Sequence, residues 1–219
     1  MDGLVIARDE QQYPPRLHAL LGAAAPPCIA LAGPLPAVAQ HALSLFCSVR
    51  CPGAMILQTY EFVSRLRHQS VTVCSGFHSP MERECLRTLM TGVAGVVWCL
   101  AKSLTSFVLP REFQPLFYAQ RLTVLSPFPD SVTRITDETA RYRNLVAAAL
   151  ADDAFLSYAA PGGHTEKFCL QLLALDKTVF TLDAPENAGI IARGAQAIQP
   201  AAAATLWPES VAAATDALL

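Results

Sequence analysis

Small, hydroxyl and basic side chains gather where two apolar segments of the sequence end, at residues 49 and 74. Serine and glycine let backbone N–H groups approach a bound anion, and a guanidinium or imidazole adds positive charge. This combination indicates a site that receives a phosphate group. The candidates in these two loops are Ser48, Arg50, Gly53, Ser75, Gly76 and His78.

A second cluster opens the predicted long helix 136–151 and comprises Arg141, Arg143 and Asn144. Two guanidiniums and an amide near a helix amino-terminus can hold phosphates in a fixed, forked geometry. The alternative is a solvated helix face on which the arginines pair with the neighbouring acidic residues 137 and 138. The residue types alone leave both interpretations open.

A third cluster, Gly162, Gly163, His164 and Thr165, follows the predicted strand 154–158. The glycines allow the backbone to come close to a ligand, Thr165 is expected to cap the next helix, and the first-turn N–H groups suit an anion. A tight turn without a ligand is the alternative.

Asn187 follows a further predicted strand, 178–182, and is a candidate to close the same site, although Asn is also a common turn former. His78 and His164 are conceivable acid–base groups, but spacing places no carboxylate beside either one. The sequence has no Walker loop, no G-x-G-x-x-G after its first strand and no G-x-S-x-G elbow. Triphosphatase, classical dinucleotide and esterase functions therefore have no motif support.

Alternating strands and helices are expected to position these clusters. The pattern predicts an α/β, Rossmann-like fold: a mostly parallel sheet of about six or more strands with helices on both faces. In such a sheet the loops after the carboxyl ends of the strands share one edge, so the clusters should meet there. The predicted strands are 43–49, 71–74, 93–100, 122–125, 154–158 and 178–182, and the predicted helices are 55–67, one from about 81, a short one through 117, 136–151 and 165–175.

The two ends of the chain differ in composition from the middle. Residues 9–36 are dense in Pro and Gly, which predicts an ordered leader rather than helix or sheet. The tail is rich in Ala and Pro and ends in an apolar-periodic segment, 211–219, predicted as a short helix. The expected division is a leader packed on the domain, the Rossmann-like domain and a tail: 1–36, 37–198 and 199–219.

The overall composition and net charge restrict the partners and the cellular location that we expect. The 219 residues are 53% hydrophobic and 16% charged, and no apolar stretch reaches the length of a membrane span. The start lacks a secretory signal, so we expect a cytoplasmic protein without a membrane partner. A net charge of −2 argues against a globally basic nucleic-acid binder but permits a local basic patch.

Seven cysteines, an odd number, lie mostly in or beside apolar runs and are expected to be reduced structural thiols. Cys47 and Cys51 have a C-x3-C spacing, but no second close pair follows. We therefore expect no metal and no cofactor.

The clusters together resemble the DNA-processing protein A (DprA, or Smf) family, which is related to the Lonely-guy phosphoribohydrolases and lysine decarboxylase-like proteins. The resemblance covers nearly all of residues 13–198. It includes the family's Y-P-x-x-L leader, G-S-R, S-G-x-A-x-G, R-N-R and G-x-N-x-L-x-x-G-A segments, which stand here at 13–17, 48–50, 75–76, 141–144 and 187–195.

Two loops depart from the family pattern. The G-x-A-x-G-I-D loop is replaced by residues 77–82, which lose the glycine and the aspartate and end in Glu82. The S-G-S-x-x-T turn is replaced by residues 161–166, which look closer to the P-G-G-x-G-T-x-x-E motif of the phosphoribohydrolases and end in Glu166. The chain is therefore identified as a divergent member, and we expect it to lack the carboxyl-terminal winged helix of many relatives.

The resemblance implies single-stranded DNA binding at the pocket rim, dimerisation into a homodimer, and loading of a recombinase onto DNA during transformation. It implies a basic patch of Arg50, Arg141, Arg143, Lys102 and Arg193, and no enzymatic activity. The alternative is a nucleotide-binding or phosphoribohydrolase-like domain that holds one mononucleotide, with Glu82 or Glu166 as catalytic candidates near the sugar. A scaffold that has lost its ligand is a third possibility.

Overall fold

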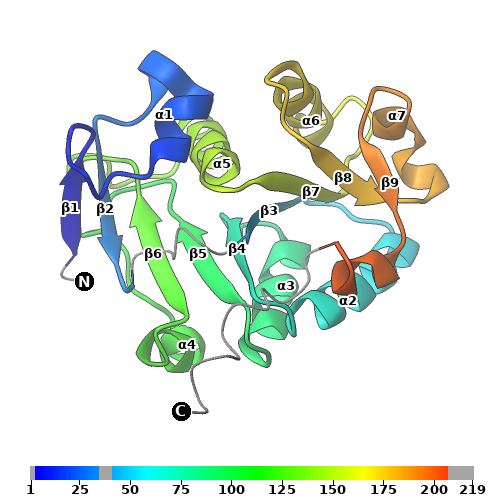
Figure 1. The fold of residues 1–219 in the computed structure, drawn as a ribbon, viewed down its shortest axis with the longest axis horizontal. Helices are drawn as coiled ribbons and strands as arrows, with labels where there is room; N and C mark the ends of the chain where they lie inside the picture. The colour runs from blue at the N-terminus through cyan, green and yellow to red at the C-terminus, as the bar shows by residue number, and fades with distance from the viewer. Residues whose placement is uncertain (1–2, 35–40, 207–219) are drawn as a thin grey trace, which may run out of the picture.

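The computed structural model describes residues 3–34 and 41–206, which form one nine-stranded sheet covered by helices on both faces (Figure 1). The strand order across the sheet is β1-β2-β6-β5-β4-β3-β7-β8-β9. The strands are β1 Leu4–Ala7, β2 Cys28–Ala32, β3 His41–Cys47, β4 Val71–Ser75, β5 Gly95–Cys99, β6 Leu122–Ser126, β7 Asp153–Tyr158, β8 Val179–Leu182 and β9 Gln196–Ile198.

Neighbouring strands from β6 through to β9 are parallel, whereas β1 and β2 join the edge antiparallel. The central strands are buried on both faces, as parallel strands between helix layers must be. All five residues of β4 and of β6 are buried. The predicted α/β, mostly parallel Rossmann-like fold is confirmed.

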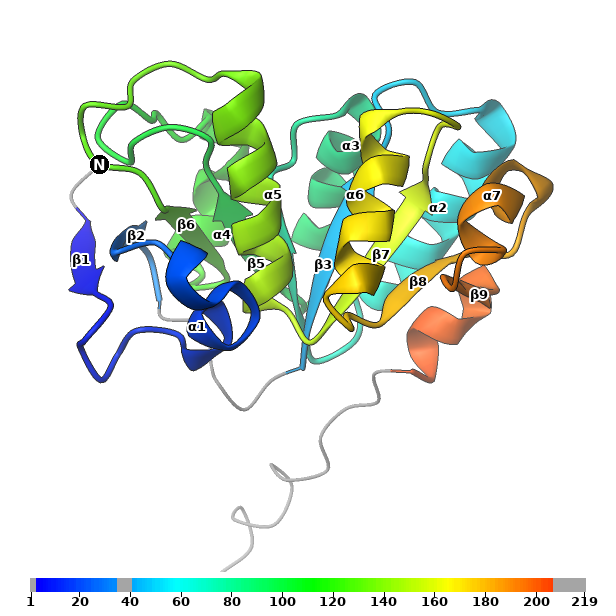
Figure 2. The same cartoon turned by 90° about the horizontal axis from the view of Figure 1, so that it is seen from above.

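Helices form a layer on each side of the sheet (Figure 2). One face is covered by α1 Pro15–Leu21, α5 Asp137–Leu150 and α6 His164–Ala174, and the other by α2 Gly53–Leu66, α3 Pro80–Met90 and α4 Gln114–Tyr118. The short α7, Ala188–Ile191, connects β8 to β9, and 3-10 turns complete the connections: η1 Gly22–Ala24, η2 Arg111–Phe113, η3 Pro185–Asn187 and η4 Pro200–Ala204.

The alternation of side chains along each strand builds a core on each face. In β3, Leu43 and Leu45 pack into one cluster together with Phe62 of α2, and Ala42 and Phe46 pack into the other. Phe62 stacks on Phe155 of β7 with ring centroids 4.0 Å apart. Successive side chains of β3 enter the two cores in turn, which fixes the register of the strand and so determines which residues lie at its carboxyl end.

The direction in which the chain adds strands reverses beside β3. From β3 the chain adds β4, β5 and β6 on one side, and it then crosses over through α5 to β7 on the other side. Ligands of open α/β sheets bind outside the carboxyl ends of the strands at such a reversal. The β3–β7 boundary is therefore where a binding site is expected.

The amino-terminal segment differs from its prediction. Residues 9–36 were expected to form neither helix nor sheet, and this is wrong: they contain α1 and β2, and β2 pairs with β6. Pro15 is the first residue of α1, a position where proline is favourable because the missing N–H is not needed. β9 was also not predicted, and the predicted helix 211–219 lies outside the described residues.

In the part of the chain that the structure describes, no helix is both long enough and apolar enough to cross a membrane.

Candidate functional site

The loops after β3 and β7 are joined directly to one another. The Ser48 Oγ accepts a hydrogen bond from the Ala160 N–H at 2.9 Å, and the Ser48 N–H donates to the Tyr158 carbonyl at 3.0 Å. Ser48 is buried. Its hydroxyl therefore holds the two loops together, which makes it a positioning group of the edge. Arg50 and Gly53, which follow, are exposed.

Glu82 joins the end of β3 to the loop after β4. Its Oε1 accepts from the Cys47 N–H at 3.0 Å, and its Oε2 accepts from the N–H groups of His78 and Ser79 at 2.7 and 3.2 Å. The Ser79 Oγ in turn accepts from the Glu82 N–H, which completes a capping box at the start of α3. The three N–H donors occupy both carboxylate oxygens.

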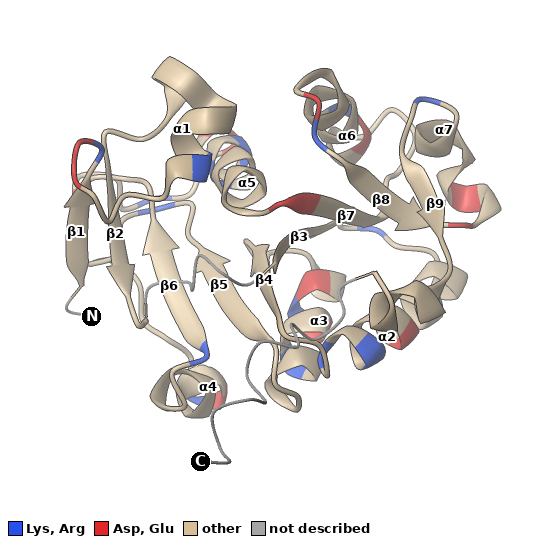
Figure 3. Ribbon diagram, viewed as in Figure 1, with Lys and Arg blue, Asp and Glu red and all other residues tan. Residues whose placement is uncertain are grey.

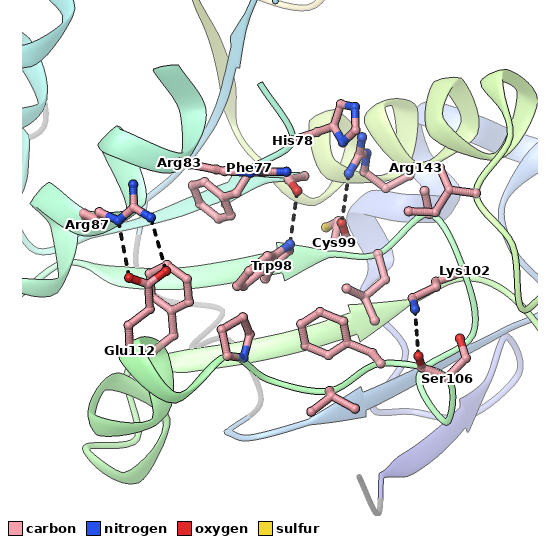
Figure 4. Close-up of a pocket in the computed structure, with 18 residues that line it drawn as sticks. Phe77, His78, Arg83, Arg87, Trp98, Cys99, Lys102, Ser106, Glu112 and Arg143 are labelled. Carbon is pink, nitrogen blue, oxygen red and sulfur yellow. Dashed lines mark hydrogen bonds and ion pairs between the residues drawn. The ribbon is translucent and has the colours of Figure 1, made fainter. Parts of the chain in front are cut away.

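Arg143 lies against Gly76, the residue after β4. A Cβ built on Gly76 would overlap the Nη1, Cζ and Nε atoms of Arg143, so only glycine leaves room for the guanidinium. Arg143 Nε donates to the Asn144 side chain at 2.8 Å. Its Nη1 donates to the Cys99 carbonyl at 3.3 Å, as Figure 4 shows. Ser75 is buried and accepts from the Phe77 N–H at 3.2 Å.

The charge of Arg143 is buried without a paired acid. The side chain is 6% exposed, and no carboxylate forms an ion pair with it among the residues that the structure describes. Burial lowers the pKa of Arg143, and the nearby Glu82 carboxylate opposes that shift. A buried cation without a counter-ion is costly, and it is a common feature of sites that receive an anionic ligand.

A small pocket of about 190 Å³ opens at the β3–β7 boundary, and we call it the switch-point pocket. Arg141 and Asn144 from one predicted cluster, and His164 and Thr165 from another, all line it. The complete lining is Phe46, Cys47, Glu82, Arg141, Asn144, His164, Thr165, Lys167, Phe168 and Gln171. Arg141 Nε donates to the Asp137 backbone carbonyl at 3.2 Å, so the expected alternative pairing with acidic side chains does not occur.

The glycine turn after β7 is held by Glu166. Gly162 has a positive φ of 70°, and its N–H donates to Glu166 Oε2 at 2.8 Å. Glu166 Oε1 pairs with Arg193 at 2.9 Å. Gly163 is the N-cap of α6 and Thr165 lies within the first turn, so the expectation that Thr165 caps this helix is wrong. Glu166 and Arg193 thus stabilise the turn together.

Asn187 is buried at the carboxyl ends of β7 and β8, where it is 1% exposed. Its Nδ2 donates to the carbonyls of Ser157 and Leu182 at 3.0 and 3.2 Å, and its Oδ1 accepts from the Ala159 N–H at 3.4 Å. The amide therefore bridges β7 and β8. The structure does not bring Asn187 together with the other predicted phosphate ligands.

A larger cavity of about 490 Å³ lies beside the first pocket, at the carboxyl ends of β4 and β5, and we call it the β5 cavity (Figure 4). Its lining includes Gly76, His78, Trp98, Lys102 and Arg143. Trp98 is the functional candidate that sequence reasoning missed: the signal was an aromatic residue next to the carboxyl end of a buried strand.

The charge around these pockets is carried by loops and helices, because β4, β5 and β6 contain no charged residue (Figure 3). In the described ranges 3–34 and 41–206, no ion pair involves Arg50, Arg83, Arg141, Lys102 or Lys167. No group of three or more potential metal ligands occurs in those ranges. The seven cysteines are all unpaired.

Two solved structures share this architecture. DNA processing protein A from Streptococcus pneumoniae matches with a TM-score of 0.76 and 14% identity, covering 91% of this chain and 72% of that one. The structure of DNA processing protein A from Helicobacter pylori, which gives insight into the single-stranded DNA binding mode of that protein, matches with a TM-score of 0.73 and 14% identity. The match covers 90% of this chain and 91% of that one.

No curated protein matches the sequence. The family model described as DNA recombination-mediator protein A, in contrast, matches residues 4–215, almost the whole chain. The chain therefore belongs to the family of DNA recombination-mediator protein A.

Proposed function

We propose that this protein binds single-stranded DNA along the carboxyl edge of its sheet, with strand phosphates held at the switch-point pocket, and that it acts in DNA processing and uptake. The family to which the chain belongs supports a role in DNA recombination. The Helicobacter pylori protein of the same fold, which binds single-stranded DNA, supports the choice of ligand.

One observation carries the proposal: two cationic side chains line the switch-point pocket, against one carboxylate, Glu82. Arg141 and Lys167 line it, and neither forms an ion pair with a described residue. Among the described residues the one acid in its lining, Glu82, already accepts three backbone N–H groups. A phosphate oxygen is negatively charged and accepts hydrogen bonds, so a phosphate group would pair with the cations of this pocket.

The size of the pocket favours a strand over an enclosed mononucleotide. Sites that enclose small molecules usually measure about 300 to 1,000 Å³, whereas the switch-point pocket measures about 190 Å³. A phosphate and part of a sugar would fill it, and the rest of a strand would continue along the edge. Positive grooves that follow the backbone are typical of single-strand binding without sequence preference.

The interactions of Glu82 and Glu166 support a binding function rather than a catalytic one. A phosphoribohydrolase-like reaction needs a carboxylate free to act at the sugar. Glu82 accepts from three N–H groups, and Glu166 accepts from Gly162 and pairs with Arg193. We propose that neither is catalytic and that both shape the loops.

The proposal extends to the assembly and the location. We propose a cytoplasmic homodimer that passes bound DNA to a recombinase; the family description, a mediator of recombination, supports the last of these steps. Light scattering of the purified protein tests the dimer, and co-precipitation of a recombinase with the DNA-bound protein tests the transfer.

The contribution of Arg141 can be measured directly. Because the residue is exposed, Arg141→Ala should leave the fold intact and weaken binding of a labelled single-stranded oligonucleotide by about tenfold, from the loss of one charge-assisted phosphate contact. Fluorescence anisotropy measures the affinity. The matched control is Arg65→Ala, which removes an exposed arginine from the last turn of α2. Equal affinities for Arg141→Ala and the control would refute the role of the switch-point pocket.

A further inference from the structure

We propose that Cys47 and Cys51 form an oxidation site, at which a peroxide converts the two thiols into a disulfide bond. The inference goes beyond the proposed DNA-binding function and does not depend on it. It is drawn from three features of the chain between β3 and α2: two thiols in contact, the position of Cys51 beside a helix start, and a buried hydroxyl beside Cys47.

The turn from β3 into α2 brings the two thiols together. Cys47 is the last residue of β3, and Cys51 precedes Pro52, the N-cap of α2. Cys47 is buried in the core cluster on this face of the sheet, and Cys51 packs against the same cluster. The Cys47 thiol donates a hydrogen bond to the Cys51 sulfur, and neither residue is in a disulfide. Only the loop 48–50 between them therefore has to adjust for a bond to form.

Cys51 is the nucleophile of the pair. Its side chain is partly exposed, so a small oxidant can reach it. The hydrogen bond from Cys47 lowers the pKa of Cys51, against the effect of burial. Cys51 also lies beside the amino-terminus of a 14-residue helix whose first turn contains no acidic residue, and the exposed Arg50 precedes it. The positive end of a helix and a neighbouring cation both favour a thiolate.

Cys47 is the thiol that completes the disulfide. It is 5% exposed, and the hydrogen bond to Cys51 together with burial raises its pKa, so it stays protonated and does not react first. The Ser157 hydroxyl is buried without a hydrogen-bond partner among the described residues, and its presence opposes the rise in the pKa of Cys47. This hydroxyl can therefore donate to the Cys47 sulfur when the thiol loses its proton.

The two steps balance with hydrogen peroxide as the oxidant. The Cys51 thiolate attacks one peroxide oxygen, the O–O bond breaks, and the leaving hydroxide takes up a proton to become water. The product is a sulfenic acid on Cys51. The Cys47 sulfur then attacks the Cys51 sulfur, the S–O bond breaks, and the hydroxide leaves as water with the proton of the Cys47 thiol. Two thiols are oxidised, and one peroxide is reduced to two waters.

The other thiols of the chain do not share these features. Burial raises the pKa of the three thiols that are at most 1% exposed, Cys74, Cys85 and Cys99. Burial also raises the pKa of Cys169 to about 11. Cys28 is partly exposed, but it lies in β2, and three strands separate β2 from β3. Cys28 therefore provides an internal reference for an accessible thiol outside the pair.

Peptide mapping after treatment with hydrogen peroxide tests the site. Trypsin cleaves after Arg50, so Cys47 and Cys51 leave on separate peptides, 17–50 and 51–65, unless a disulfide joins them. We expect the joined peptides to appear, with fragmentation placing the bond at Cys47, and dithiothreitol to restore both thiols. The pair should be consumed about tenfold faster than Cys28, as expected for a thiol with a lowered pKa. The oxidised chain should run as a single chain on a non-reducing gel.

Two variants separate the roles of the thiols. Cys51→Ser should leave Cys47 reduced under the same treatment. Cys47→Ser should stop the reaction at the sulfenic acid of Cys51, which dimedone labels, and thermal denaturation checks that this buried substitution leaves the protein folded. The inference is overturned if peroxide leaves both thiols of the unaltered protein free, or if fragmentation places the bond at Cys28. It is also overturned if Cys51 of the folded Cys47→Ser variant takes up dimedone no faster than Cys28 does.

Discussion

Gly76 is important for the site because it has no side chain. The guanidinium of Arg143 lies where a Cβ on Gly76 would stand. The sequence predicted both residues as ligands, Gly76 from the loop after a strand and Arg143 from a helix start, but residue types cannot reveal that one packs on the other. Their contact depends on tertiary packing between β4 and α5.

Gly76→Ala tests this contact. The added methyl group must displace Arg143, whose hydrogen bonds to Asn144 and Cys99 would then be lost. We expect a loss of about 2 kcal/mol in the free energy of unfolding, from overpacking and unmet hydrogen bonds, measured by urea denaturation. Gly53→Ala is the control, because a Cβ there meets no atom within 4 Å. A Gly76→Ala protein as stable as Gly53→Ala would contradict the packing.

The Cys51 thiol should react with alkylating agents faster than the Cys47 thiol does. A hydrogen bond from the Cys47 thiol lowers the pKa of Cys51, while the same bond and burial raise the pKa of Cys47. The thiolate is the nucleophile, so a lowered pKa increases the alkylation rate of Cys51 at pH values below the pKa of an ordinary thiol. At higher pH ordinary thiols also ionise, and the difference in rate disappears.

Peptide mapping after iodoacetamide treatment at neutral pH should therefore find Cys51 alkylated before Cys47. Cys47→Ala removes the donor and should slow alkylation of Cys51. An unchanged rate in that variant would show that the hydrogen bond does not control the reactivity.

At the scale of elements, Glu82 fixes how α3 begins. The capping box formed by Ser79 and Glu82 can be read from the S-P-M-E sequence. The hydrogen bond from the Cys47 N–H to Glu82 joins two residues that are 35 positions apart in the sequence, and no local pattern predicts it. The resemblance to phosphoribohydrolases suggested a catalytic role for this residue, whereas the structure shows a connection between β3 and α3.

Glu82→Ala should therefore act on stability. It leaves three buried or half-buried N–H groups without their acceptor, and we expect the free energy of unfolding to fall by about 2 to 3 kcal/mol, measured by thermal and urea denaturation. Glu84→Ala, on the same helix, removes only an exposed pairing with Arg87 and should change stability by less than about 0.5 kcal/mol. Equal effects of the two substitutions would argue against the connection.

Elements with strong periodicity were predictable, and those defined by long-range pairing were not. The strands β3 to β8 and the helices α2, α5 and α6 follow from hydrophobic patterns. β2 was missed because its five residues lie among prolines and glycines, and its strand character comes from pairing with β6. β9 has only three residues and depends in the same way on β8.

At the scale of the whole molecule, a chain with a net charge of −2 carries Arg141 and Lys167 together in the lining of one pocket at the edge of its sheet. The parallel sheet brings the carboxyl ends of β3, β4 and β7 together, and with them cations that lie up to 117 positions apart, from Arg50 to Lys167. The edge was predictable because sheet direction fixes it. The division at residues 36 and 198 stays a prediction, although β1 and β2 extend the same sheet.

The most direct test of the central claim is the salt dependence of single-stranded oligonucleotide binding, measured by fluorescence anisotropy with free mononucleotides as competitors. If Arg50, Arg141 and Lys167 each neutralise a phosphate, affinity should fall about 20-fold between about 50 and 200 mM salt. Mononucleotides should not displace the strand from the switch-point pocket. Binding that ignores salt, or no binding to the strand at all, would contradict the account.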